Sequence, residues 1–121
     1  NNTIEITRRD TLEKQTISID KITQKVENLL ENIQNNLFNR SCDFRENNSF
    51  YVNSKVEFIN KIDEGGFVYA HWDGSSKTEE LIKQETKATI RCIPLDSLKE
   101  TGVCLFSGNT SDQRVLFSKA Y

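Results

Sequence analysis

Gly66-Phe67-Val68-Tyr69-Ala70-His71-Trp72-Asp73-Gly74 is the stretch that decides the fold. Its centre, residues 67–72, is a continuous apolar and aromatic run of strand length that ends at turn-forming residues, and such a run predicts a buried strand. The pair Gly65-Gly66 predicts the end of a helix, because glycine readily adopts the left-handed conformation that closes one. Asp73-Gly74-Ser75 predicts a turn after the strand.

A helix is predicted on either side of this strand. Ser54 and Glu57 are spaced as a capping box, in which the serine oxygen accepts from the backbone and the glutamate reaches back. The apolar face of that helix is supplied by Val56, Phe58, Ile59 and Ile62. Ser76 and Glu79 form a second capping box, which opens a helix that runs through about Thr86.

The longest predicted element is a helix from Asp20 to about Arg45, with the Asp20 carboxylate capping its first turn. Apolar residues recur along it at steps of three and four and form one stripe: Ile22, Val26, Leu29, Leu30, Ile33 and Leu37. Such a stripe faces a core. We expect Leu29, Leu30, Ile33 and Leu37 to hold the fold together.

The remaining segments predict strands. Thr3–Thr7 and Gln15–Ile19 alternate polar and apolar residues and can pair as a hairpin across a charged turn. Further strands are expected at residues 88–93, 103–106 and 114–119. The order of elements predicts an α+β fold: a small mixed or antiparallel sheet with one long and two shorter helices.

The amino-acid composition argues against several classes of function. Lys and Arg number 16 and Asp and Glu number 18, so the net charge of −2 argues against a freestanding nucleic-acid binder with a dense basic face. The 121 residues suit one domain, and the absence of Met suggests a processed chain or a piece of something larger. The first residues have no signal-peptide pattern, and no apolar run approaches the roughly 20 residues of a membrane span. A soluble, cytoplasmic protein without a membrane partner is expected.

Cysteine and histidine give little catalytic signal. Cys42, Cys92 and Cys104 form an odd set with no C-x-x-C pair, which suggests free thiols in a reducing compartment. Cys42 and Cys92 are expected to be buried small residues. His71 in an apolar strand is expected to be a core residue with its ring N–H satisfied. Neither a nucleophile elbow nor a glycine-rich phosphate loop appears, so no catalytic residue is assigned.

Several ordered motifs resemble one known family. Residues 66–74, then Glu79-Glu80-Leu81-Ile82-Lys83, then Glu85 to Pro94, then Phe117-Ser118-Lys119-Ala120-Tyr121 are similar to the C-terminal domain of archaeal/eukaryote-type prolyl-tRNA synthetases. Upstream, residues 8–11 resemble the close of that family's anticodon-binding domain, and residues 29–38 resemble its linking helix. The resemblance covers nearly the whole chain.

The resemblance implies part of a ligase that joins proline to its tRNA with ATP and Mg²⁺. Residues 1–19 would be the last strand and turn of the anticodon-binding domain with its linker, and residues 20–121 the C-terminal, zinc-binding-like domain. The implied partners are the tRNA for proline, the upstream catalytic and anticodon-binding domains, and a second subunit in a homodimer. The terminal Tyr121 would reach back to support the active site of the full-length enzyme.

In the resembled family this domain often holds Zn²⁺ on four Cys. Alignment of the motifs places those positions at Asp73, Thr78, Cys104 and Ser107. Only one thiol remains, and Ser and Thr hydroxyls are poor zinc ligands at neutral pH. We therefore expect neither zinc nor any other cofactor in this chain, with hydrogen bonds and packing in place of the metal.

Two questions stay open in the sequence. Arg8, Arg9 and Lys14 are candidates for contact with the tRNA backbone, but they equally suit a solvated turn balanced by Asp10 and Glu13. A small independent RNA- or protein-binding module is the alternative to an accessory domain of a synthetase, and a degenerate metal-binding domain is a third reading.

Overall fold

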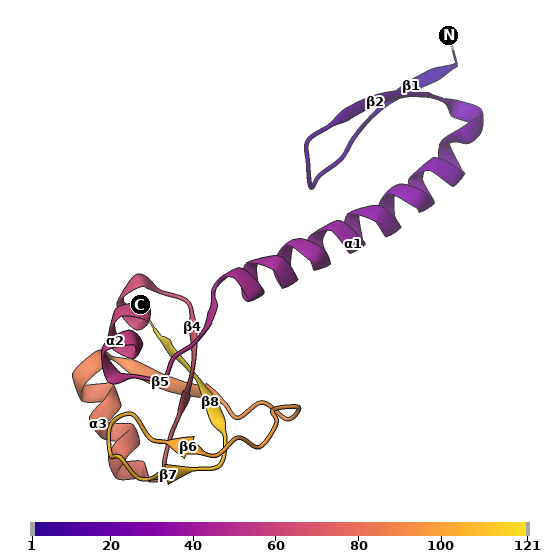
Figure 1. Cartoon of the computed structure of the whole chain (residues 1–121). Helices are drawn as coiled ribbons and strands as arrows, with labels where there is room; N and C mark the ends of the chain where they lie inside the picture. The colour runs from indigo at the N-terminus through magenta and orange to yellow at the C-terminus, as the bar shows by residue number, and fades with distance from the viewer. Residues whose placement is uncertain (1, 121) are drawn as a thin grey trace. The chain divides into compact units, whose positions relative to one another are not determined.

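The computed structural model describes residues 2–120, which form two compact units that divide between Glu46 and Asn47. Figure 1 shows the elements of both units. No helix within residues 2–120 has the length and apolar character that crossing a membrane requires.

The first unit is a hairpin with the long helix. Strands β1 (Thr3–Thr7) and β2 (Lys14–Ser18) pair antiparallel, as their alternation predicts. A short 3-10 helix, η1 (Ile19–Lys21), leads directly into α1 (Ile22–Asn47), whose last residue belongs to the second unit. The predicted cap at Asp20 is therefore wrong. Asp20 lies inside the 3-10 turn, and the N–H of Ile22 donates to the carbonyl of Ile19.

Only part of the predicted α1 stripe is covered. Ile33 is buried and Leu29 is half-buried, but Leu30 is 58% exposed and Leu37 is 39% exposed. The prediction that Leu30 and Leu37 face a core is wrong for this unit. The physical reason is that a two-stranded ribbon is too narrow to cover a wide apolar stripe on a helix.

The second unit is built on a four-stranded mixed sheet with the strand order β3-β4-β8-β5. β3 and β4 are parallel, whereas β8 runs antiparallel to both β4 and β5. The elements of this unit are β3 (Ser49–Tyr51), α2 (Lys55–Glu64), β4 (Phe67–His71), α3 (Ser76–Thr86), β5 (Ala88–Cys92), β6 (Gly102–Val103), β7 (Thr110–Ser111) and β8 (Arg114–Lys119). The predicted α+β class with one long and two shorter helices is confirmed.

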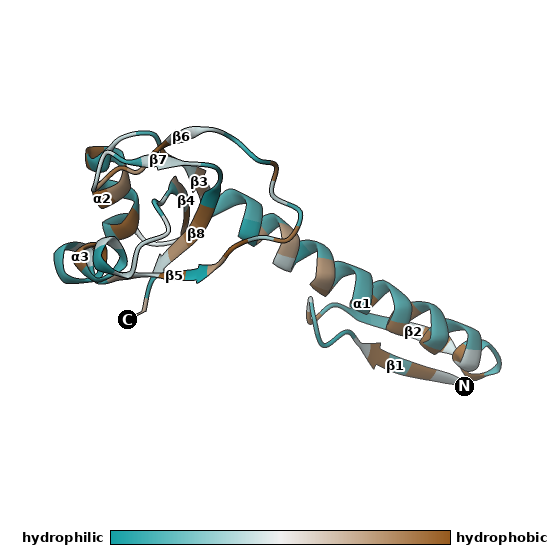
Figure 2. Ribbon diagram, turned by 90° about the horizontal axis from the view of Figure 1, so that it is seen from below, coloured by the Kyte–Doolittle hydropathy of each residue, from teal (hydrophilic) through white to brown (hydrophobic). Residues whose placement is uncertain are grey.

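The core of this unit lies between the sheet and its two helices. Figure 2 shows hydrophobic residues on β4 and β8 and along α2. Phe58 of α2 packs edge-on against Phe117 of β8 and against Phe106, with ring centroids 5.0 and 5.4 Å apart. Val68 and Ala70 of β4 are fully buried, so the predicted buried strand is confirmed.

Helix α2 begins and ends largely as predicted. The N–H of Glu57 donates to the Ser54 side chain, while the Glu57 carboxylate accepts from the N–H of Asn53, one residue before the cap. Gly65 closes the helix with a positive φ of 93°. Val56, however, is 69% exposed and takes no part in the apolar face. It lies two positions from Phe58, and residues two apart on a helix point in different directions.

Three other local predictions need correction. Ser75, not Ser76, caps α3, and its side chain accepts from the N–H of Thr78. The strand expected at residues 103–106 is only the two-residue β6, after which residues 105–107 form a turn. No strand was predicted at β3, because three residues are too few to show a period.

The unequal burial of α1 gives a matched test. Ile33→Ala should destabilise the chain by roughly 2–5 kcal/mol, because it removes buried methylene groups and leaves a cavity. Leu30→Ala, on the exposed side of the same helix, should change stability by less than about 0.5 kcal/mol. Thermal or urea unfolding followed by circular dichroism measures both. Equal effects from the two substitutions would contradict the burial described here.

Candidate functional site

A cluster of hydrogen bonds surrounds the Asp73 carboxylate at the end of β4. One carboxylate oxygen accepts from the backbone N–H of Ser75 at 2.9 Å, and the other accepts from the Thr78 hydroxyl at 2.8 Å. The Asn109 side-chain amide donates to the second oxygen at 3.4 Å, and the Ser107 hydroxyl also donates to the carboxylate. The cluster therefore joins the end of β4, the start of α3 and the turn between β6 and β7.

The hydroxyl groups of this cluster form a directed chain. The Ser75 hydroxyl donates to the Thr78 hydroxyl at 3.0 Å, and the Thr78 hydroxyl in turn donates to Asp73. Thr78 is only 6% exposed, so its hydroxyl depends on these protein partners rather than on water. Partial burial by itself would raise the pKa of Asp73, but the hydrogen bonds from Ser107, Ser75 and Thr78 outweigh it and hold that pKa well below its usual value.

The four positions aligned with zinc ligands do not fit a zinc ion. The structure brings Asp73, Thr78 and Ser107 together, but the two hydroxyls act as donors to the carboxylate, whereas a metal needs their lone pairs. Cys104 is buried and supplies one thiol. Within residues 2–120, no three His, Cys, Asp or Glu side chains gather in a group that suits a metal ion. The side chains at these four positions therefore suit a hydrogen-bonded cluster and not a zinc site.

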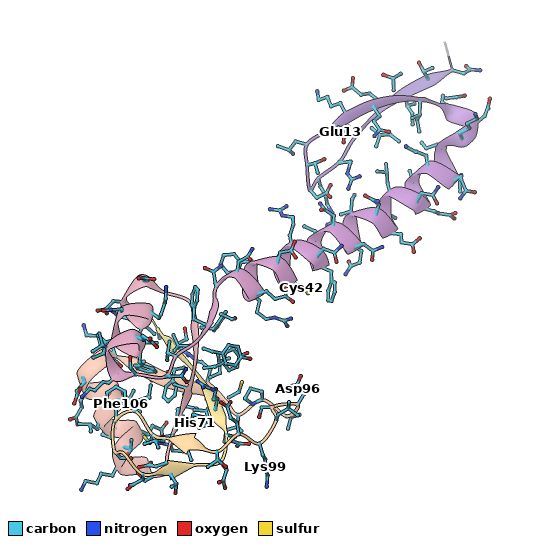
Figure 3. All side chains as sticks on the ribbon, viewed as in Figure 1. Glu13, Cys42, His71, Asp96, Lys99 and Phe106 are labelled. Atoms are coloured by element: carbon cyan, nitrogen blue, oxygen red, sulfur yellow. The ribbon has the colours of Figure 1, made fainter. Side chains whose placement is uncertain are left out.

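His71 is the core residue that the sequence predicts. It is 6% exposed, and its Nδ1 lies 2.9 Å from the Ser111 hydroxyl. Because that hydroxyl donates to the carbonyl of Gln113 at 2.9 Å, Nδ1 carries the proton and donates to Ser111. The imidazole packs against Gly102, where a Cβ atom would lie only 2.3–2.7 Å from three of its ring atoms, so a side chain there would collide with it. Figure 3 shows His71 within the folded second unit.

The three candidate tRNA-contact residues differ in their surroundings. Arg8 forms a bidentate pair with Asp10, through Nε at 3.0 Å and a terminal nitrogen at 2.8 Å. This bond lowers the pKa of Asp10, as does the bond from Asn36 of α1. Lys14 is 3.5 Å from Glu5 and largely exposed. Arg9 is exposed, and no partner is found for it within residues 2–120.

Burial was predicted for Cys42 and Cys92, and both predictions were wrong. Cys92 is exposed and Cys42 is half-buried, whereas only Cys104 is buried. Cys92 comes late in β5, where the pairing with β8 shifts register and the strand's last two residues are exposed. Cys42 lies on the long helix, where the packed stripe is narrow.

Sequence reasoning missed a second polar centre at Arg114. Its guanidinium donates to Glu100 at 3.0 and 3.3 Å, to the carbonyl of Val52 at 2.7 Å and to the Asn53 side chain. The bonds from Arg114, and more weakly the neighbouring His71, lower the pKa of Glu100. The sequence does show an arginine at the start of an apolar strand, which is an unusual place for a charge. Its partners cannot be inferred, because they lie too far away in the sequence.

The family model for the C-terminal domain of prolyl-tRNA synthetase matches residues 56–121, more than half of the chain. The chain belongs to this family. The match includes the Asp73 cluster, His71 and Arg114, and it supports the resemblance to synthetases of the archaeal/eukaryote type.

Individual relatives match along the entire chain. The chain is 57% identical to the proline–tRNA ligase of Parabacteroides distasonis and 54% identical to that of Azobacteroides pseudotrichonymphae, each over 121 residues. The crystal structure of prolyl-tRNA synthetase from Cryptosporidium parvum with L-proline and AMP is similar over 99% of this chain, with 25% identity and a TM-score of 0.90. The chain spans about a quarter of the length of these relatives, 24% of the curated ones and 26% of the solved structure.

The lowered pKa of Asp73 predicts a pH dependence of this domain. A carboxyl group whose pKa is lower in the folded state contributes stability above its unfolded pKa of about 3.9, and loses it as pH falls through the folded value. Unfolding at pH 7 and pH 3 should therefore show a loss of stability in acid. That loss should be smaller in Asp73→Asn. Asp63→Asn, an exposed carboxyl that lies 3.6 Å from Lys119, is the control. An acid response equal in all three proteins would contradict the role given to Asp73.

Proposed function

We propose that this chain is the C-terminal part of a cytoplasmic enzyme that joins proline to its tRNA, with ATP and Mg²⁺ as the cofactors of the whole enzyme. The observation that carries the proposal is identity above one half to proline–tRNA ligases over all 121 residues. The ligands of two Cryptosporidium parvum synthetase structures are halofuginone with AMPPNP, and L-proline with AMP. They belong to that protein, of which this chain matches about a quarter. The catalytic groups would lie in the remaining three quarters.

Within that enzyme the chain is an accessory structural domain on the tRNA side. The hairpin, with residues 1–19, would complete the anticodon-binding domain, and residues 20–121 would form the C-terminal domain. The Asp73 cluster would take the place of the family's zinc site, with Asp73, Thr78, Cys104 and Ser107 as the equivalent positions. The enzyme would act as a homodimer.

Arg9 is the best of the three candidates for a tRNA phosphate contact. It is exposed and has no carboxylate partner in the described part of the chain, whereas Arg8 is held by Asp10 and Lys14 lies near Glu5. A phosphate contact adds affinity without reading sequence, and salt weakens it. Arg8 would instead fix the hairpin turn.

Tyr121 is outside the residues that the structure describes, and its role remains a proposal. A terminal tyrosine combines a large apolar ring, a phenol and a free carboxylate, which suits a specific pocket. We place it as a supporting residue of the synthetase site in the whole enzyme. The chain that precedes it is held in the sheet, since β8 runs to Lys119.

Aminoacylation by the complete protein tests this function. The complete protein should show proline-dependent ATP–pyrophosphate exchange and charge the tRNA, whereas residues 1–121 alone should show neither. Removal of Tyr121 should lower charging, and Arg9→Ala should raise the KM for tRNA more at low salt than at high salt, because salt already weakens the phosphate contact in the unchanged protein. Arg91→Ala, an exposed cation on β5, is the control. A complete protein that fails to activate proline overturns the proposal.

A further inference from the structure

One loop of the second unit exposes an unusual amount of apolar surface. Between β5 and β6 the chain reads Ile93-Pro94-Leu95-Asp96-Ser97-Leu98-Lys99, here called the leucine loop. Leu95 is 106% exposed and Leu98 is 88% exposed, more than any other large apolar side chain described in this unit, which covers residues 47–120. Figure 1 shows the loop extending away from the sheet, and Figure 3 shows Asp96 at its outer end and Lys99 on the limb that returns toward the sheet.

The leucine loop lies beside a second apolar feature, which is formed by two tyrosines of β3 and β4. Tyr51, which is 69% exposed, stacks on Tyr69 with ring centroids 4.7 Å apart. Both rings line a hollow of about 400 Å³ together with Pro94 and Leu98. Leu98 is therefore part of a patch with the two tyrosines, and Leu95 lies three residues before it in the same loop. Exposed apolar patches of this kind mark interaction sites.

Hydrogen bonds hold the C-terminal end of the loop, next to β6. The N–H of Glu100 donates to the carbonyl of Asp112 at 2.7 Å, and the Glu100 carboxylate accepts twice from Arg114. A turn inside the loop is closed by the N–H of Ser97, which donates to the carbonyl of Pro94 at 3.2 Å. The two leucines are thus presented on a turn with a fixed base, which lowers the entropy cost of binding.

Two polar groups of the loop lack partners. The Ser97 hydroxyl oxygen is buried and has no hydrogen-bond partner in the described residues, and it is the one such side-chain atom found there. A buried hydroxyl without a partner costs about 1–3 kcal/mol. The Asp96 carboxylate also has no ion pair within residues 2–120. Both groups line the same hollow as Tyr51.

We propose that the leucine loop and Tyr51 form the surface on which the rest of the synthetase polypeptide docks. Leu95 and Leu98 would enter an apolar depression on that part of the chain, and a cation beside the depression would pair with Asp96. This inference rests on the proposed function, because it takes the missing three quarters of the relatives' length as the occupant.

The size of the patch favours a covalently linked occupant over a second copy of this chain. A stable interface between separate proteins buries about 20–30 residues on each side, whereas this patch consists of Tyr51 and a seven-residue loop. Docking within one polypeptide needs less surface, since the linked partner has an effective concentration in the mM range.

Hydroxyl-radical footprinting of the complete protein and of residues 1–121 alone tests the inference. Oxidation of Leu95 and Leu98 should be slower in the complete protein by about fivefold or more, because the core of an interface excludes water. Val56 on α2 is 69% exposed and outside the patch, so its oxidation rate should stay within about twofold. Leu95→Ser with Leu98→Ser should lower the melting temperature of the complete protein but not of residues 1–121.

The possible outcomes separate the inference from the proposed function. Equal leucine oxidation in both proteins overturns the docking surface, even where the complete protein charges tRNA normally. Protection that appears in residues 1–121 alone as concentration rises also overturns it, in favour of a second copy. Protection in a complete protein that cannot activate proline supports the docking surface while the proposed function fails.

Discussion

The second unit depends on the hydrogen bonds that the Asp73 carboxylate accepts. Three segments far apart in the sequence meet there: the end of β4, the first turn of α3 and the turn after β6. A carboxylate has about four acceptor positions, so it can satisfy donors from all three segments at once. Its charge also suits the start of a helix, where free N–H groups point outward. In this respect the carboxylate does what a four-ligand metal ion does for a small domain, without the metal.

The apolar core and the polar junctions stabilise the second unit in different ways. Phe58, Phe117 and the buried face of β4 supply the burial that drives folding of the second unit. Asp73 at one edge and Arg114 at another fix the connections between the elements, since both satisfy several partners that lie far away in the chain. The first unit lacks such a core: Ile33 is its one buried residue among those described, and a lone two-stranded hairpin with a helix is marginal by itself.

The local structure was largely predictable from the sequence, and the long-range structure was not. The buried strand at residues 67–71, the cap at Ser54 and the closing Gly65 follow from short patterns with a local physical cause. The α1 stripe was misjudged because periodicity shows which residues are apolar but not how wide a partner covers them. The positions around Asp73 came from the family resemblance, whereas Asn109 and the Arg114 partners had no sequence signal, because their contacts span up to 62 residues.

We infer that hydrogen bonds to Asp73, and not a metal ion, close the junction of the second unit. Elemental analysis of residues 1–121, combined with thermal unfolding with and without EDTA, tests it most directly. The account predicts no stoichiometric zinc, the same melting temperature in EDTA, and a melting temperature lower by several degrees in Asp73→Ala, which leaves the buried Thr78 hydroxyl without its acceptor. Stoichiometric zinc in the purified protein, or unfolding of the wild-type chain in EDTA, would contradict it.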